Sequence, residues 1–181
     1  MNLFELLYIL EQNEIHMARL LILLRSFGGK WGKKSINGLT KLVKLDFLLR
    51  YPNYLEKSLE VINVSPKKMK IKAYEKKGVE SKMVRFRYGP WDPRYRHFIN
   101  LLVAKGLTNI DIKGRTIYIN LTDKGIEQAD KLIEIDAFKD ITLRTEILKE
   151  YFDRSGTYLK DFIYQNFPEI TTLSLWEAIE P

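Results

Sequence analysis

Residues 92–135 hold three differently patterned segments in immediate succession, and the first of them has the pattern of a helix. Apolar residues recur at helical spacing from Tyr95 to Val103, which places them on one face. Asp92 is expected to be the N-cap, because its carboxylate can accept hydrogen bonds from the first free backbone amides. Pro93 suits the first helical turn, where a missing N–H leaves no bond unmade. The segment therefore predicts a helix that starts directly after Asp92.

A two-stranded hairpin is predicted next. Residues 107–112 and 116–121 flank Gly114, and isoleucine recurs at alternate positions on both sides. Thr122 then has the side chain and the position of an N-cap for a further amphipathic helix. Helix, tight wing and capped helix, after two earlier apolar helices, is the order of a winged helix. We therefore expect a mainly α chain with a small β-hairpin and a winged-helix core.

Apolar residues at helical spacing also fill the first part of the chain. The predicted helices there cover residues 15–27, 37–50 and 54–62. The apolar stretch at residues 1–10 lacks a basic start and a small-residue cleavage site, so we expect a short helix there and not a signal peptide. No run reaches the ~18 apolar residues that a membrane span requires. The resulting expectation is a soluble, cytoplasmic protein.

The link between the second predicted helix and the helix before the hairpin is long and basic. Residues 65–88 carry nine Lys or Arg against two Glu, with strand-like alternation near residues 69–74 and 83–88. A DNA-reading helix-turn-helix joins its helices by only a few residues. An insertion at about residues 63–88 would lie beside the recognition helix, which argues against a standard transcription factor.

The last part of the chain is predicted to be a helical extension. Apolar spacing gives three expected helices there, at residues 138–152, 158–167 and 171–179. Trp176 is expected to be an exposed aromatic residue of this tail. The domain division that follows is a winged-helix domain over residues 1–135 and a helical extension over residues 136–181.

Charge is distributed unevenly along the chain. Residues 1–105 hold 21 Lys and Arg against 9 Asp and Glu, whereas residues 106–181 hold 9 against 14. A basic first part and an acidic second part suggest two surfaces with different partners. The basic one would suit either nucleic acid or an acidic protein surface, and charge alone does not separate the two.

Groups that could carry catalysis are scarce. The chain has no cysteine, which excludes a disulfide and a thiolate metal site. Its two histidines, His16 and His97, lie far apart in the sequence, and each is expected to be an ordinary helix residue. Neither a nucleophile elbow nor a phosphate-binding loop is present. We therefore expect no enzyme, no metal site and no cofactor.

The segment from Arg85 to Asp92 is unusual because it combines arginines, aromatic residues and a Gly-Pro step. Trp91 could be a hydrophobic staple that packs on the first turn of the next helix. Alternatively, residues of this segment anchor a partner, since Arg, Tyr and Trp dominate interface hot spots. The candidate partner-binding residues are Arg87, Tyr88, Trp91, Arg94, Arg96 and Trp176.

Contact with nucleic acid is the other role considered for the basic residues. Lys and Arg in the insertion and at the wing tip could bind phosphates without reading sequence. The alternative for the insertion is a solvated, charged loop. The candidate residues for contact with double-stranded DNA are Lys67, Lys68, Lys70, Lys72, Lys76, Lys77, Lys113 and Arg115.

Two motifs resemble one known family. The first is INGLTKLVKLDFLLRYP at residues 36–52, and the second is RYGPWDPRY at residues 87–95, followed by the apolar helix of residues 101–107. Together they look like the small middle component of bacterial ABC-three-component systems, which include Lamassu-type anti-phage defence. The resemblance covers roughly residues 14–135 and does not include the acidic tail.

The resemblance implies a function and two partners. Members of this family accompany an ATPase that resembles structural-maintenance-of-chromosomes (SMC) proteins and a separate effector, often a nuclease. The middle component would be a non-catalytic subunit that bridges or holds them. Winged-helix subunits of this kind commonly dock on ATPase heads or on the bases of coiled coils.

A winged-helix transcription regulator or antitoxin is the competing hypothesis. A related antitoxin-like helical domain also carries a Lys-Leu-x-Lys-Leu helix and a later Tyr-Gly-Pro. In that interpretation Lys41, Lys44, Arg94 and Arg96 would contact DNA or a toxin. A palindromic operator and a homodimer would favour the regulator, whereas a neighbouring gene for a long ATPase would favour the bridge.

Overall fold

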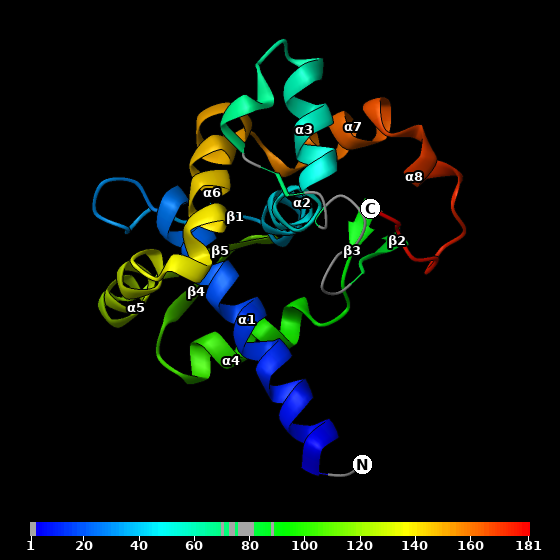
Figure 1. Cartoon of the computed structure of the whole chain (residues 1–181). Coiled ribbons are helices and arrows are strands. Elements are labelled where there is room, and N and C mark those ends of the chain that lie inside the picture. Colours follow the sequence, from blue (N-terminus) through cyan, green and yellow to red (C-terminus); the bar gives the residue numbers. More distant parts are fainter. Residues whose placement is uncertain (1–2, 70, 73–74, 76–81, 88) are drawn as a thin grey trace. The chain divides into compact units, whose positions relative to one another are not determined.

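The computed structural model of the chain (Figure 1) describes residues 3–69, 71–72, 75, 82–87 and 89–181, with side chains described from residue 13 onward except at residue 68. The described part is mainly helical with small antiparallel sheets, so the expected mainly α class is confirmed. It divides into two compact units. Unit 1 consists of Met1–Ile36 and Arg94–Thr142, and unit 2 of Asn37–Pro93 and Leu143–Pro181.

Each unit is therefore built from two separate stretches of chain. The division at residue 135 that the sequence suggested does not coincide with the units, because residues 143–181 cluster with residues 37–93. The winged-helix domain over residues 1–135 stays a prediction.

Unit 1 is organised around its first helix, α1 (Leu3–Phe27). This helix contacts α4 (Tyr95–Ala104), α5 (Asp123–Ile133) and the strand β5 (Thr116–Leu121). It starts well before residue 15, where the apolar spacing first became clear, because no proline or glycine interrupts residues 3–14. Its buried side chains include Leu20, Ile22, Leu23 and Leu24.

The predicted hairpin is confirmed in unit 1. Strands β4 (Thr108–Lys113) and β5 pair antiparallel, with Ile110 opposite Ile119. A short strand, β1 (Ile36–Asn37), adds to the sheet and gives the order β1-β5-β4. Two residues are too few to show alternation in the sequence, and β1 was therefore not predicted.

Thr122 caps α5, as predicted. Its hydroxyl accepts a hydrogen bond from the Gly125 amide at 2.9 Å and donates one to the Gly106 carbonyl at 2.7 Å. The side chain thus ties the start of α5 to the turn that ends α4.

Thr122→Ala should lower the free energy of unfolding by about 1 kcal/mol, because the Gly125 amide loses its acceptor. Urea denaturation of the whole chain measures the change. Thr157→Ala, at an exposed threonine within α7, removes the same atoms without a cap and should leave the stability close to that of the wild type. Equal effects of the two substitutions would contradict the capping role.

Unit 2 is organised around α2 (Leu39–Arg50). This helix contacts α3 (Pro52–Val61), α7 (Gly156–Asn166) and the strand β3 (Gly89–Trp91). Strand β3 pairs antiparallel with β2 (Val84–Phe86). The remaining elements are η1 (Pro66–Met69), η2 (Asp136–Phe138), α6 (Lys139–Phe152), which runs from unit 1 into unit 2, and α8 (Pro168–Thr172).

Three local predictions are wrong. Asp92 is not the N-cap of α4: the helix begins at Tyr95, its N-cap is Arg94, and no side chain caps it. Residues 171–179 are not one helix, because α8 ends at Thr172 and a bend, a turn and an isolated β-bridge follow. Met69 ends a 3-10 helix and residues 71 and 72 form no strand, whereas residues 70, 73 and 74 lie outside the described part.

Candidate partner-binding corner

The two sequence motifs are bonded to each other in unit 2. The amine of Lys44, on α2, donates to the Pro90 carbonyl oxygen at 2.8 Å. Further along α2, the Arg50 guanidinium donates to the Asp92 carboxylate at 3.0 Å. We call residues 89–92 together with Lys44 and Arg50 the motif corner. The GPWD segment is therefore fixed by side chains of the first motif.

The Arg50–Asp92 pair is buried. The two side chains are only 4% and 3% exposed. A buried pair is costly to desolvate, but once it is formed each charge stabilises the other, and removing one takes a buried opposite charge away from its partner. This tertiary partner is the reason that Asp92 does not cap α4.

Lys44 is buried, and its Nζ donates to a backbone carbonyl and not to a carboxylate. Burial and, as the smaller cause, the positive charge of Lys160 together lower its pKa from 10.5 to about 7. The residue is 1% exposed. Lys44 therefore holds the backbone of the corner, and the expectation that it contacts DNA or a toxin is wrong.

The Lys44 pKa predicts how stability depends on pH. Between pH 7 and 10.5 the unfolded chain binds more protons at Lys44 than the folded chain, so the free energy of unfolding should rise with pH from pH 7 to about 10. Below pH 7 the full penalty of burying the charge is present. Above pH 10 the trend should reverse, because burial raises the pKa of Tyr51 and raises that of Tyr54 to about 12.

Lys44→Met should remove most of the rise between pH 7 and 10, because methionine fills a similar volume and does not titrate. Urea denaturation of both chains at pH 7, 8, 9 and 10 gives the two slopes. Lys57→Met, at an exposed lysine of α3, is the control and should keep the wild-type slope. A Lys44→Met slope equal to that of the wild type would show that Lys44 is not the titrating group.

The hairpin β2–β3 depends on a glycine at its turn. Gly89 has φ +95°, and a Cβ there would lie 3.4 Å from Cε of Lys44. Only glycine adopts this conformation without strain, and a Cβ would come into van der Waals contact with the lysine stem. The Gly-Pro step that stood out in the sequence thus lies against α2, and Lys44 of that helix bonds to Pro90.

Aromatic rings gather beside the hairpin. The Phe86 ring lies 6.0 Å from that of Trp91 and 4.8 Å from that of Trp176, between ring centroids. Trp176 is 56% exposed, as expected, and Arg87 is exposed at the hairpin turn. Trp91 is half-buried and belongs to β3, so it does not precede a helix as a staple would. Unit 2 therefore brings together three of the predicted partner-binding residues.

The other predicted partner-binding residues are placed differently. Arg96 is exposed on α4 in unit 1. Arg94 is half-buried, with its guanidinium carbon 5.3 Å from the Phe98 ring centroid and a nitrogen 3.4 Å from Nε2 of His16. Tyr88 lies outside the described residues.

His16 is a structural residue that sequence reasoning undervalued. It is fully buried, its ring stacks on Phe98 at 4.9 Å, and its Nδ1 lies 2.8 Å from Nη2 of Arg19. A histidine and an arginine three positions apart on an otherwise apolar helix face were the available signal. His97, by contrast, is exposed on α4.

The predicted nucleic-acid residues fall into two groups. Lys113 and Arg115 are exposed at the β4–β5 turn of unit 1. In unit 2, Lys67 and Lys72 are exposed, whereas the Lys68 side chain lies outside the described part, as do Lys70, Lys76 and Lys77. Within the same segment, Glu75 accepts two hydrogen bonds from Arg144 of α6, at 2.8 and 2.9 Å.

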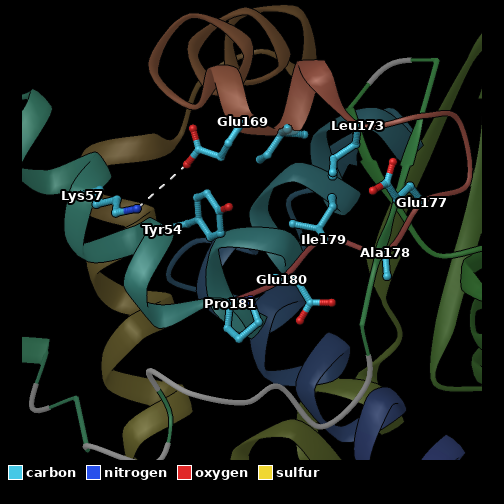
Figure 2. A pocket seen from close by; sticks show the side chains of 10 residues that line it. Tyr54, Lys57, Glu169, Leu173, Glu177, Ala178, Ile179, Glu180 and Pro181 are labelled. Atoms are coloured by element: carbon cyan, nitrogen blue, oxygen red, sulfur yellow. Dashed lines mark ion pairs between the residues drawn. The ribbon is translucent and has the colours of Figure 1, made fainter.

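A pocket of about 460 Å³ lies in unit 2. Figure 2 shows the Tyr54 ring beside the ion pair from Lys57 to Glu169, whose nitrogen and oxygen are 3.9 Å apart. The remaining lining residues are Ile170, Leu173, Glu177, Ala178, Ile179, Glu180 and Pro181. Sequence reasoning missed this pocket because its walls come from α3 and from the last residues of the chain.

Comparison with protein-family models, with curated proteins and with solved structures found no match to the chain. Among the residues that the structure describes, no three or more His, Asp or Glu are grouped as a metal site would need. Within the same part of the chain, no helix is both long and apolar enough to cross a membrane.

Proposed function

We propose that the chain is a non-catalytic subunit that binds partner proteins through the outer side of the motif corner. The observation that carries the proposal is that exposed Arg and Trp side chains lie beside a corner that buried bonds hold in place. Lys44 and Arg50 hold the corner from within, and Arg87 and Trp176 are exposed beside it. Exposed tryptophan and arginine on a preorganised support are typical of interface hot spots.

The contacts of the charged corner residues indicate that these residues have a structural role. Lys44 is bonded to a backbone carbonyl, and Arg50 and Asp92 are bonded to each other. These groups stabilise the fold and leave recognition to the exposed side chains around them.

The family resemblance identifies candidate partners. We propose that they are an SMC-like ABC ATPase and an effector subunit, as in Lamassu-type anti-phage defence. We also propose that unit 1 is the core of a winged helix. The strand order β1-β5-β4 supports this, as does the position of α4 directly before the β4–β5 wing.

Co-expression with the neighbouring genes, followed by a pull-down on this chain with nuclease added, tests the proposal. We expect a stable complex with a long ATPase that survives nuclease treatment. Recovery of the chain alone, or of a complex that nuclease abolishes, would contradict a role in protein bridging.

A DNA-binding regulator is the second candidate, and one observation favours it. Unit 1 exposes Arg96, His97 and Asn100 on α4, and it exposes Lys113 and Arg115 at the wing tip. These side chains suit contacts to bases and phosphates.

The salt dependence of DNA binding tests this candidate. If the wing contacts two phosphates, Lys113→Ala with Arg115→Ala should reduce the slope of log K against log salt by about 2. Lys67→Glu with Lys72→Glu tests the basic insertion in the same assay. Slopes that neither pair changes would exclude both surfaces from DNA contact.

A further inference from the structure

Residues 173–180, which we call the strap, turn at Leu175 and Trp176 and then lie antiparallel along the free side of β2 at residues 177–179. The Arg85 amide donates to the Glu177 carbonyl, the Trp176 amide to the Arg85 carbonyl, and the Ile179 amide to the Met83 carbonyl, each at 2.8 Å. Val84 and Ala178 form an antiparallel bridge. Strand β2 thus has β3 on one side and the strap on the other, both within unit 2.

Tyr51 joins the strap to β2 at a buried point. Its hydroxyl accepts a hydrogen bond from the Met83 amide at 2.7 Å and donates one to the Ile179 carbonyl at 3.0 Å. Tyr51 is fully buried and Ile179 is 1% exposed. This position therefore recognises both an extended backbone and an aliphatic side chain.

The two strands have complementary charges. Lys82, Arg85 and Arg87 lie on or beside β2, whereas the strap carries Glu177 and Glu180. The Lys82 amine contacts both carboxylate oxygens of Glu180, at 2.6 and 2.7 Å. The Arg85 guanidinium donates to the Leu173 carbonyl at 2.8 Å. The β2 strand and its flanks are therefore basic, and the strap that lies along it is acidic.

The strap has only one deeply buried apolar side chain, that of Ile179. Leu175 and Trp176 are more than half exposed. Trp176 has φ 71°, a backbone conformation that costs free energy for residues other than glycine. Segments with few buried apolar contacts open locally at lower free energy than the core.

We propose that the β2 edge is an exchangeable docking site for an acidic, extended peptide segment of a partner, and that residues 177–180 of the strap are the occupant supplied by the chain itself, while the Trp176 ring stays on Phe86. The partner segment carries an aliphatic residue in the place of Ile179, followed by a carboxylate that meets Lys82. Main-chain bonds to β2 supply affinity, and the Tyr51 position supplies specificity. The inference rests on the proposed partner-binding function, but it is tested on the purified chain alone, so its outcome is separate from that of the pull-down.

A disulfide lock provides the test. Val84 and Ala178 face each other between the flanking hydrogen bonds, which is the closely spaced kind of antiparallel pair and falls in the range that a disulfide spans. The chain has no cysteine, so Val84→Cys with Ala178→Cys forms one defined bond on oxidation and releases it on reduction. The probe is a fluorescein-labelled peptide with the sequence of residues 173–181. The same peptide with Ile179→Asp is its control.

Hydrogen exchange of the whole chain gives the first readout. We expect the amide of Ile179 to exchange about 100-fold faster than those of the α2 core, and to slow when the lock is oxidised. An Ile179 amide that exchanges as slowly as the α2 amides in the unlocked chain would overturn the proposal. This readout does not depend on any destabilising substitution.

Fluorescence anisotropy with the labelled peptide gives the second readout. A full-length Ile179→Asp chain, whose strap lacks its anchor, should bind the peptide at least about 10-fold more tightly than the oxidised lock. The control peptide should bind neither. Equal binding by both chains, or no binding by the reduced lock and by Ile179→Asp, would show that the β2 edge does not accept a strand in trans.

Discussion

Asp92→Ala should lower the free energy of unfolding by about 3–5 kcal/mol, because the Arg50 guanidinium stays buried after it loses the opposite charge of Asp92. Both side chains are almost fully buried, so water does not replace the lost partner. Urea or thermal denaturation followed by circular dichroism measures the loss. The effect should fall on unit 2, which contains both residues.

A double variant separates the ion pair from simple loss of packing. Arg50→Met with Asp92→Leu removes both charges and should be more stable than Asp92→Ala alone, since no buried charge is left over. Glu127→Ala, at an exposed ion pair with Lys131, is the surface control and should change stability little. If the double variant loses as much stability as Arg50→Met alone and Asp92→Leu alone lose together, the pairing is contradicted.

Gly125→Ala should destabilise unit 1 by at least about 3 kcal/mol, because no space exists for a methyl group. A Cβ at this position would lie 1.9 Å from the Leu107 carbonyl oxygen and 2.9 Å from its carbon. These are backbone atoms, so relief requires moving α5 or the start of β4. Denaturation of the whole chain, with loss of near-ultraviolet signal, measures the effect.

Gly114→Ala is the matched control for Gly125→Ala. Gly114 has φ +61° at the wing tip, but nothing lies within 4 Å of a Cβ there. Its replacement should cost only the ~1 kcal/mol of a left-handed conformation. If the two alanine variants are equally stable, the close approach of α5 to Leu107 is not present in solution.

Elements defined by local pattern could be predicted from the sequence. The β4–β5 hairpin follows from alternation around Gly114, and the start of α5 follows from the Thr122 cap. Both depend on residues that are neighbours in the chain. The same holds for α2, whose end at Arg50 is set by the proline at residue 52.

Elements decided by distant partners could not be predicted. Asp92 has the residue type of an N-cap, yet Arg50 outcompetes the helix for its carboxylate. Residues 171–179 have helical spacing, yet residues 176, 177 and 179 form backbone hydrogen bonds with Met83 and Arg85 instead. In both cases a tertiary bond overrides local propensity, and single-sequence patterns contain no record of it.

The candidate site was foreseen by residue type and not by geometry. Arg87, Trp91 and Trp176 were singled out because such residues dominate interfaces, and unit 2 places them around Phe86 and the β2–β3 turn. Their support was not foreseen. The bonds from α2 to the corner join residues more than forty positions apart.

The affinity of the chain for its co-purified partner, measured with two tryptophan variants, tests the partner-binding account most directly. Trp176→Ala removes the exposed ring beside the corner, and Trp31→Ala removes a ring that is 73% exposed in unit 1. We expect Trp176→Ala to weaken binding at least about 10-fold, as for a hot-spot residue, while Trp31→Ala retains wild-type affinity. Unchanged affinity of Trp176→Ala and of Arg87→Ala would contradict the account, because the motif corner would then not be where a partner binds.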